Sequence, residues 1–211
     1  MTLRKIAFCA LCITIIGGVF GQSQKVQAQR WLQTSQLFVE LQTDGPARAL
    51  MDTLVQVIQR SDSIMVRRSR ESNETVGLSK LRDKLINGPG IGLASASHVF
   101  IDYRFMIENR GFEESIEGFQ FIFRAGQGQE DIQMMYVDAN EPWVNEVLRN
   151  KGTTLRTNQA ALKTFNDQLA FARMHDNGKI VEISGNTVRE GFERKKRKLV
   201  EKITRLTYES M

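Results

Sequence analysis

The chain of 211 residues carries a formal net charge of +5 and contains two cysteines, Cys9 and Cys12. Both cysteines lie within the first 28 residues, so the remaining 183 residues exclude a disulfide framework, a thiol nucleophile and a cysteine metal site. A length of 183 residues is sufficient for one domain that buries on the order of 70% of the surface of its unfolded chain, and a core of that size needs no covalent cross-links.

The N-terminus has the layout of a secretory signal peptide. Arg4 and Lys5 form a basic start, residues 6–21 carry no charge, and a small-residue cleavage site ends at Ala28. As a helix the uncharged run would span about 24 Å, which is shorter than the ~30 Å hydrocarbon core of a bilayer. We therefore expect residues 1–28 to be removed and the protein to be exported, to the periplasm or outside the cell. A retained anchor is the alternative.

The remaining charge is unevenly distributed. The predicted signal peptide accounts for +3 of the net charge, which leaves +2 for residues 29–211. Residues 189–205 hold eight basic and three acidic residues, a net charge of +5, so the rest of residues 29–211 carries −3. The sequence therefore predicts a mildly acidic body with one basic segment, whatever the overall isoelectric point.

Two helices are expected early in the chain. Residues 30–43 are ambiguous between a strand and a helix. Residues 43–63 have Asp44 as a cap, a proline in the first turn and one apolar stripe, which predict a helix. A second helix is expected within residues 73–90, because three leucines align on one face and Gly88 followed by a proline ends the pattern.

From residue 98 the apolar period changes to two, as in half-buried strands. Strands are expected at residues 98–109, 116–126 and 132–138, with turns at 109–115 and 127–131. Three strands joined by short turns predict an antiparallel meander. Because each strand has one apolar face, helices must cover that face of the sheet.

Further helices and one strand are expected in the C-terminal part. Helices are predicted at residues 140–152, at 157–174 with a stripe formed by Leu162, Phe165, Leu169 and Ala172, and at about 187–208 with Thr187 and Glu190 at capping-box spacing. Residues 176–184 predict a turn and a short strand at the sheet edge. The predicted fold class is thus α+β, in which an antiparallel meander of three or four strands packs against four or five helices. Residues 29–211 are expected to form a single domain.

The last helix carries the clearest candidate for a binding surface. Its apolar stripe is interrupted by lysines, so its middle cannot be buried completely. The residues predicted to contact a partner or membrane are Arg194, Lys195, Lys196, Arg197, Lys198, Lys202 and Arg205. These residues can form a solvated face, bind anionic lipid head groups or bind an acidic protein partner. Nucleic acid is a poor match for an exported protein.

Aromatic side chains on the predicted strands form the densest apolar feature. The set consists of Tyr103, Phe105, Phe119, Phe121 and Phe123. Core packing beneath the helices is the simple explanation, and an apolar pocket for a lipid-like ligand or a partner segment is the alternative. A carrier of that kind requires a cavity beside Phe119 and Phe121.

Signatures of catalysis and metal binding are weak. The glycine-rich residues 87–92 end a helix rather than open one, so a phosphate loop is not expected. His98 and His175 lack the spacing of metal ligands, and Glu113 and Glu114 fall in a predicted turn exposed to water. We therefore predict no catalytic residue, no metal site and no cofactor.

These patterns favour a non-catalytic binding or scaffolding module of the cell envelope, whose basic C-terminal helix contacts an anionic membrane or an acidic partner. Two alternatives remain open. One is a periplasmic carrier or chaperone that binds an apolar ligand or segment on the aromatic sheet, and the other is a hydrolase with dispersed catalytic residues, in which a histidine meets a serine and a carboxylate in one cleft.

Overall fold

The computed structural model describes residues 31–108, 111–126, 129–153, 164–184, 186–187 and 192–210. The predicted signal peptide lies outside these residues. Within the described part, no helix combines the length and the apolar character needed to cross a membrane.

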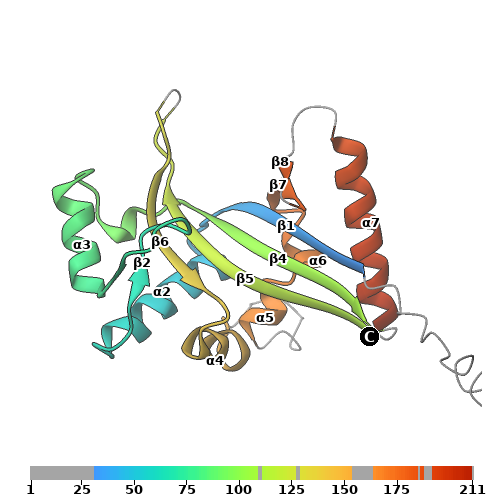
Figure 1. The fold of residues 1–211 in the computed structure, drawn as a ribbon, viewed down its shortest axis with the longest axis horizontal. Helices are drawn as coiled ribbons and strands as arrows, with labels where there is room; N and C mark the ends of the chain where they lie inside the picture. The colour runs from blue at the N-terminus through green and yellow to red at the C-terminus, as the bar shows by residue number, and fades with distance from the viewer. Residues whose placement is uncertain are drawn as a thin grey trace, which may run out of the picture.

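Strands of the described residues form one antiparallel sheet in the order β3-β2-β6-β5-β4-β1-β7-β8 (Figure 1). The strands are β1 (Trp31–Glu40), β2 (Val66–Arg67), β3 (Thr75–Val76), β4 (His98–Glu108), β5 (Gly111–Phe123), β6 (Ile132–Asp138), β7 (Gly178–Ile183) and β8 (Asn186–Thr187). The helices are α2 (Pro46–Gln59), α3 (Leu78–Asn87), α4 (Pro142–Asn150), α5 (Phe165–Gln168), α6 (Phe171–Met174) and α7 (Glu193–Ser210), with a 3₁₀ turn at Leu93–Ser95.

β1 is a central strand of this sheet. It pairs with β4 along all ten of its residues and with β7 on its other side. Leu37 and Val39 face the same side as their β4 partners Ile101 and Val99, and all four side chains are buried. The strand interpretation of residues 30–43 is therefore the right one, and the period-two pattern of β1 matches a sheet with one covered face.

The covered face of the sheet carries α2, α4, α5 and α6 (Figure 1). α3 lies at the end of the molecule near β2, and α7 lies at the opposite end. One hydrophobic cluster joins the sheet to these helices. In its centre Phe171 of α6 meets the rings of Tyr103 and Phe105 edge-on, with ring centroids 5.3 and 5.1 Å apart. The Tyr103 hydroxyl also donates a hydrogen bond to the Leu169 carbonyl at 2.7 Å.

The predicted fold class is wrong in its strand and helix counts. The α+β character is present, but the described residues contain eight strands and six α-helices, not three or four strands and four or five helices. The three-strand meander β4-β5-β6 exists as expected. β7 is the strand predicted within residues 176–184, but it lies between β1 and β8 rather than at the sheet edge. The further strands are β1, which pairs with β4 and β7 across large sequence separations, and three two-residue strands too short to show any period.

Three element boundaries also differ from the predictions. Residues 111–115 belong to β5 rather than to a turn, since Glu108 already pairs with Gly111. In the described part of residues 157–174, two single-turn helices replace one long helix, and Leu162 lies outside the described residues. The last helix starts at Glu193 rather than near Thr187, because Thr187 belongs to β8 and pairs with β7. Glu190, the other half of the predicted capping box, lies outside the described residues.

Candidate functional site

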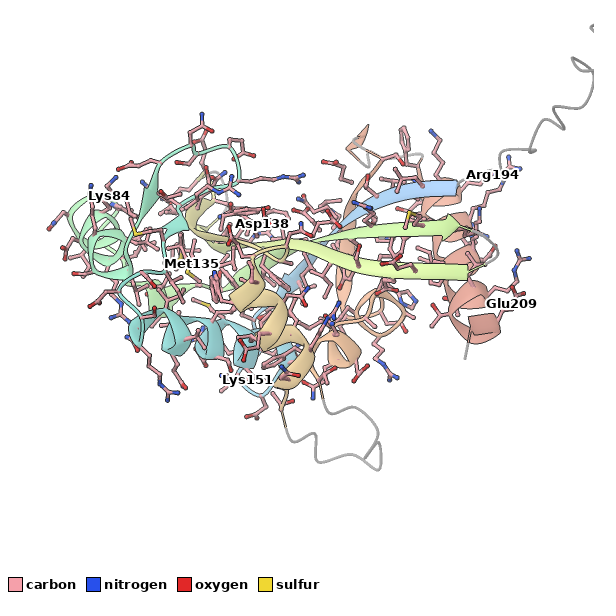
Figure 2. The ribbon with its side chains drawn as sticks, turned by 60° about the horizontal axis from the view of Figure 1, so that its bottom comes forward. Lys84, Met135, Asp138, Lys151, Arg194 and Glu209 are labelled. Carbon is pink, nitrogen blue, oxygen red and sulfur yellow. The ribbon has the colours of Figure 1, made fainter. Side chains whose placement is uncertain are left out.

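The predicted contact residues share one helix, α7, at one end of the molecule. Arg194, Lys195, Arg197, Lys198 and Arg205 are exposed, and Lys196 and Lys202 are half-buried. Figure 2 labels Arg194 and Glu209 near the two ends of this helix, far from Lys84 on α3. The seven predicted residues are therefore brought together on one surface, which we call the α7 basic surface.

Few acidic groups neutralise the α7 basic surface. Lys196 lies 4.0 Å from Glu193, and Arg205 lies 3.5 Å from Glu209. Lys195 instead places its ammonium 4.6 Å from the centroid of the Phe192 ring. Among the described residues, no salt bridge within 4.0 Å involves Arg194, Arg197 or Lys198. A surface with this excess of positive charge attracts anions and anionic surfaces.

The centre of the apolar stripe of α7 is packed against the domain. Leu199 is 6% exposed and Ile203 is fully buried, and both belong to the hydrophobic core. Helices that lie in a membrane interface insert their apolar face among the acyl chains. In this fold Leu199 and Ile203 pack against the domain, so the exposed outer surface of α7 is formed mainly by the basic residues.

The predicted aromatic set occupies the core. Tyr103, Phe105, Phe119 and Phe121 are at most 1% exposed, and Phe123 is partly buried against the same cluster. Phe119 and Phe121 stack with centroids 6.3 Å apart. These rings pack against neighbouring core side chains, so their arrangement is that of structural residues rather than of a surface for an apolar ligand.

Glu114 is a feature that sequence reasoning missed. It lies on β5 opposite Phe105, on the helix-covered face, rather than in an exposed turn. Its Oε1 accepts a hydrogen bond from the Phe171 backbone N–H at 2.6 Å. Burial raises the pKa of Glu114 to about 7, although this hydrogen bond acts in the opposite direction. The length of β5 is the only sequence signal for this placement, because position 114 is part of the strand only if β5 starts early. Glu117 is an extra residue in the register between β4 and β5, and this irregularity turns Glu114 toward the helix-covered face.

A cavity of about 550 Å³ lies beside Glu114, between β5 and the helices α4 to α7. Its lining mixes charge and hydroxyl groups, with Arg149, Arg173 and Asp167 among the charged residues and Thr204 contributed by α7. The cavity thus offers cationic hydrogen-bond donors and carboxylate acceptors, and nothing in the described residues selects one ligand for it.

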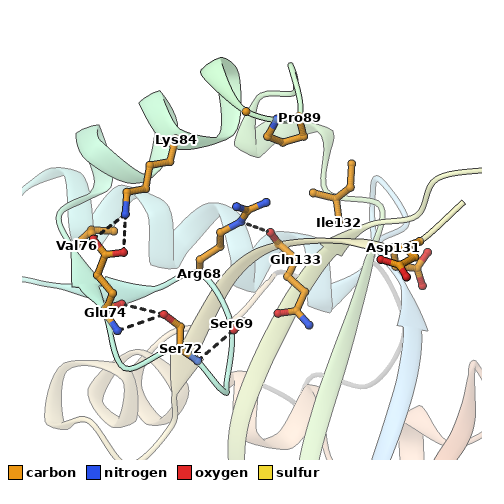
Figure 3. Close-up of a pocket in the computed structure, with 12 residues that line it drawn as sticks. Arg68, Ser69, Ser72, Glu74, Val76, Lys84, Pro89, Asp131, Ile132 and Gln133 are labelled. Carbon is orange, nitrogen blue, oxygen red and sulfur yellow. Dashed lines mark hydrogen bonds and ion pairs between the residues drawn. The ribbon is translucent and has the colours of Figure 1, made fainter.

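Another cavity, about 760 Å³, lies beside the end of α3 (Figure 3). Its cations are already engaged, because Lys84 contacts both oxygens of Glu74 at 2.6 Å and Arg68 donates to the Gln133 carbonyl at 3.0 Å. Gly88 and Pro89 line it where α3 ends, and helix C-termini carry partial negative charge. The glycine-rich segment therefore borders the cavity without offering the amides that a phosphate needs.

A polar row crosses the face of the sheet opposite the helices. Asp102 is 7% exposed and is contacted by Gln36 at 2.8 Å and by Arg70 at 3.2 Å. Burial raises the pKa of Asp102, while the hydrogen bond from Gln36 and the charge of Arg70 oppose that shift. The neighbouring Gly118 leaves the space that the Tyr136 ring fills. This row is internally satisfied and ties the segment after β2 to the sheet.

The two histidines have different surroundings. His175 Nε2 lies 3.2 Å from Asp176, as in an ordinary turn. His98 is stacked on Phe38, and its Nδ1 lies 2.9 Å from the hydroxyl of Ser97. Ser97, His98 and Asp131 line a cavity of about 520 Å³. Burial first, and the nearby Arg124 cation second, lower the pKa of His98.

Within the described residues, no group of three or more histidine, cysteine, aspartate or glutamate side chains is arranged to hold a metal ion. No protein-family model matches the chain, and no curated protein matches it either. Its function is therefore inferred from the residues and their geometry.

Proposed function

We propose that the protein is an exported, non-catalytic binding module of the cell envelope and that its α7 basic surface contacts the anionic lipids of a membrane. One observation carries this proposal. α7 exposes five basic side chains outward while Leu199 and Ile203 of its apolar stripe are buried in the domain core. The helix is thus held rigidly with a cationic face toward solvent.

The expected contact is electrostatic and peripheral. A lysine or arginine close to an anionic membrane surface contributes on the order of 1 kcal/mol, so several together support a measurable affinity. Such an attraction decays over a Debye length of about 8 Å at physiological ionic strength, which makes it sensitive to salt. An acidic protein partner has the same charge but lacks the continuous surface, and it is the outcome that remains if membranes do not bind.

Co-sedimentation with lipid vesicles tests the proposal. Residues 29–211 are mixed with neutral or anionic vesicles at low and high salt. We expect sedimentation with anionic vesicles alone, a loss of binding at high salt, and a loss of binding in a variant with Lys195, Lys196, Arg197 and Lys198 changed to Gln. If the protein sediments with neither kind of vesicle at any salt concentration, membrane contact by α7 is excluded, and an acidic protein becomes the partner to seek.

Ser97 and His98 support a second candidate function, hydrolysis. In the tautomer with its proton on Nε2, His98 accepts a hydrogen bond from the Ser97 hydroxyl at 2.9 Å, and its lowered pKa keeps the imidazole neutral. The Ser97 hydroxyl oxygen also accepts a hydrogen bond from the backbone N–H of Arg124 at 2.9 Å. Treatment with a fluorophosphonate probe would label Ser97 if it is a nucleophile, and the Ser97→Ala variant would lose the label. An unlabelled wild-type protein would leave Ser97 as a residue that joins β4 to β5.

A further inference from the structure

A crevice lies between α7 and the strands β1 and β7 of the sheet. Its volume is about 350 Å³. Ile183 of β7, together with Phe192 and Leu199 of the α7 segment, supplies apolar walls. Gln33 and Ser184, which are hydrogen-bonded to each other, add polar groups to its lining. The crevice therefore combines apolar walls with one neutral polar pair.

Three lysines line the same crevice from one side of α7. Lys195, Lys198 and Lys202 are spaced i, i+3 and i+7, so they form a row along the helix flank that faces the sheet edge. The arginines of α7, which are Arg194, Arg197 and Arg205, do not line it and are exposed. Apart from Lys196, the α7 basic surface thus has two parts, a lysine row at the crevice and an outward arginine row.

We propose that this crevice takes up one acyl chain of an anionic phospholipid from the membrane surface, with Lys195, Lys198 and Lys202 around its phosphate. This inference rests on the proposed function, since it names the lipid component that the α7 basic surface recognises. It adds a specific contact to an attraction that would otherwise depend on charge alone.

The chemistry of the crevice matches such a ligand. Long lysine stems can pack along apolar surface while their ammonium groups reach toward water. The ammonium of Lys195 lies 4.6 Å from the ring centroid of Phe192, so positive charge and an apolar wall meet in this crevice. Burial lowers the pKa of Lys202, with the Arg205 cation as a further cause, so a phosphate there would stabilise its charged form. The volume lies near the lower end of the range of ligand pockets, about 300–1,000 Å³, which fits part of one chain rather than both chains of a lipid.

Soluble alkyl phosphates isolate the chain contact from the membrane. The full chain is titrated with inorganic phosphate and with butyl, hexyl and octyl phosphate below their micelle concentrations. Burial of each added methylene should tighten binding by about fourfold until the crevice is filled. Affinity that does not change with chain length would overturn the proposal, because charge alone would then account for it.

Two matched triple variants separate the lysine row from the general charge. Changing Lys195, Lys198 and Lys202 to Gln, or changing Arg194, Arg197 and Arg205 to Gln, removes the same net charge from the same helix. We expect the lysine variant to bind octyl phosphate about tenfold or more weakly than the arginine variant. Equal losses would overturn the proposal.

A filled crevice provides a variant without any change of charge. Ile183→Trp adds volume at the crevice wall, so it should abolish the dependence on chain length while salt-sensitive binding to anionic vesicles persists. Vesicles of anionic lipid with a photoreactive acyl chain should then cross-link the wild-type protein at the crevice residues, and Ile183→Trp much less.

These outcomes distinguish the two levels of inference. If the wild-type protein binds no anionic vesicle, the proposed function fails. If it binds vesicles but its cross-links avoid the crevice and Ile183→Trp changes nothing, the proposed function stands and the acyl-chain site is excluded.

Discussion

Glu114 shows how a single side chain links the sheet to the helices. Its carboxyl accepts the Phe171 N–H, a group that a continuous helix would have bonded to a carbonyl four residues earlier. The chain therefore breaks between α5 and α6, and the aromatic ring of Phe171 points into the core. The carboxyl that makes this contact is buried, so its charged form is disfavoured.

That burial predicts a specific pH dependence. The pKa of Glu114 is about 7 in the folded protein and near 4.5 in the unfolded chain, so the folded state holds its proton between these values. The contribution of this group to the free energy of unfolding is therefore greatest below pH 4.5, and it decreases by about 3 kcal/mol as the pH rises to 7. Glu114→Gln keeps the acceptor for Phe171 and should remove this loss, which makes the variant more stable than wild type at pH 8.

Urea unfolding at pH 4.5 and pH 8 measures the effect. Glu113→Gln is the matched control, because Glu113 is adjacent on β5 but exposed. A Glu114→Gln variant with no gain in stability at pH 8 would contradict the burial of the carboxyl.

Gly118 tests the polar face of the sheet. A Cβ built there would lie 2.6 Å from the Tyr136 hydroxyl oxygen and 3.1 Å from Cζ of the same ring. Tyr136 is 6% exposed and lies under the Arg67 guanidinium at 4.6 Å, so the ring has little room to retreat. We expect Gly118→Ala to lower the free energy of unfolding by about 1–3 kcal/mol.

Chemical denaturation of two further variants checks this reason. Tyr136→Phe removes the closest atom and should recover part of the loss when combined with Gly118→Ala. Gly126→Ala is the control, since a Cβ at that position meets nothing within 4 Å. A Gly118→Ala protein as stable as the Gly126→Ala protein would refute close packing of Tyr136 on β5.

At the scale of elements, the sequence predicted what local periodicity can encode. α2, α3, α4 and the β4-β5-β6 meander have unbroken apolar stripes or alternation, and each lies where it was expected. The missing strands depend on distant partners. β1 is defined by its pairing with β4 and β7, and β2, β3 and β8 have two residues each, which no periodicity can reveal.

The same reason explains what was missed in the candidate site. The basic residues of α7 were visible as a run of sequence, but their separation into a crevice-facing row and an outward row depends on how Leu199 and Ile203 dock. The split of residues 164–174 into α5 and α6 depends on Glu114, which lies about 50 residues earlier in the sequence. Neither contact leaves a local pattern.

Ile203 tests the docking of α7. It is fully buried on a helix that otherwise carries many charges, so its side chain anchors the element to the core. Ile203→Ala should lower the free energy of unfolding by about 2–4 kcal/mol. Arg205→Ala, two residues later on the exposed side, should change it by less than about 0.5 kcal/mol. Thermal unfolding of both variants decides, and equal small effects would show that α7 is not held by its apolar stripe.

At the scale of the whole molecule, charge and burial act together. Within residues 29–211, the segment 189–205 carries +5 and the remainder carries −3, so an anionic membrane would attract the segment far more strongly than the rest. α7 and α3 lie at opposite ends of the molecule (Figure 1), so the proposed contact through α7 would leave α3 farthest from the lipid.

This arrangement predicts binding without insertion. A peptide of residues 192–210 has its apolar stripe free, so it should insert into an anionic lipid monolayer and raise the surface pressure. The folded protein hides Leu199 and Ile203 in its core, so it should bind the same monolayer with at most a small rise, limited to the uptake of single acyl chains. Surface-pressure measurements at constant area compare the two. A folded protein that raises the pressure as much as the peptide does would mean that α7 leaves the core at the membrane, and the peripheral contact proposed for it would be wrong.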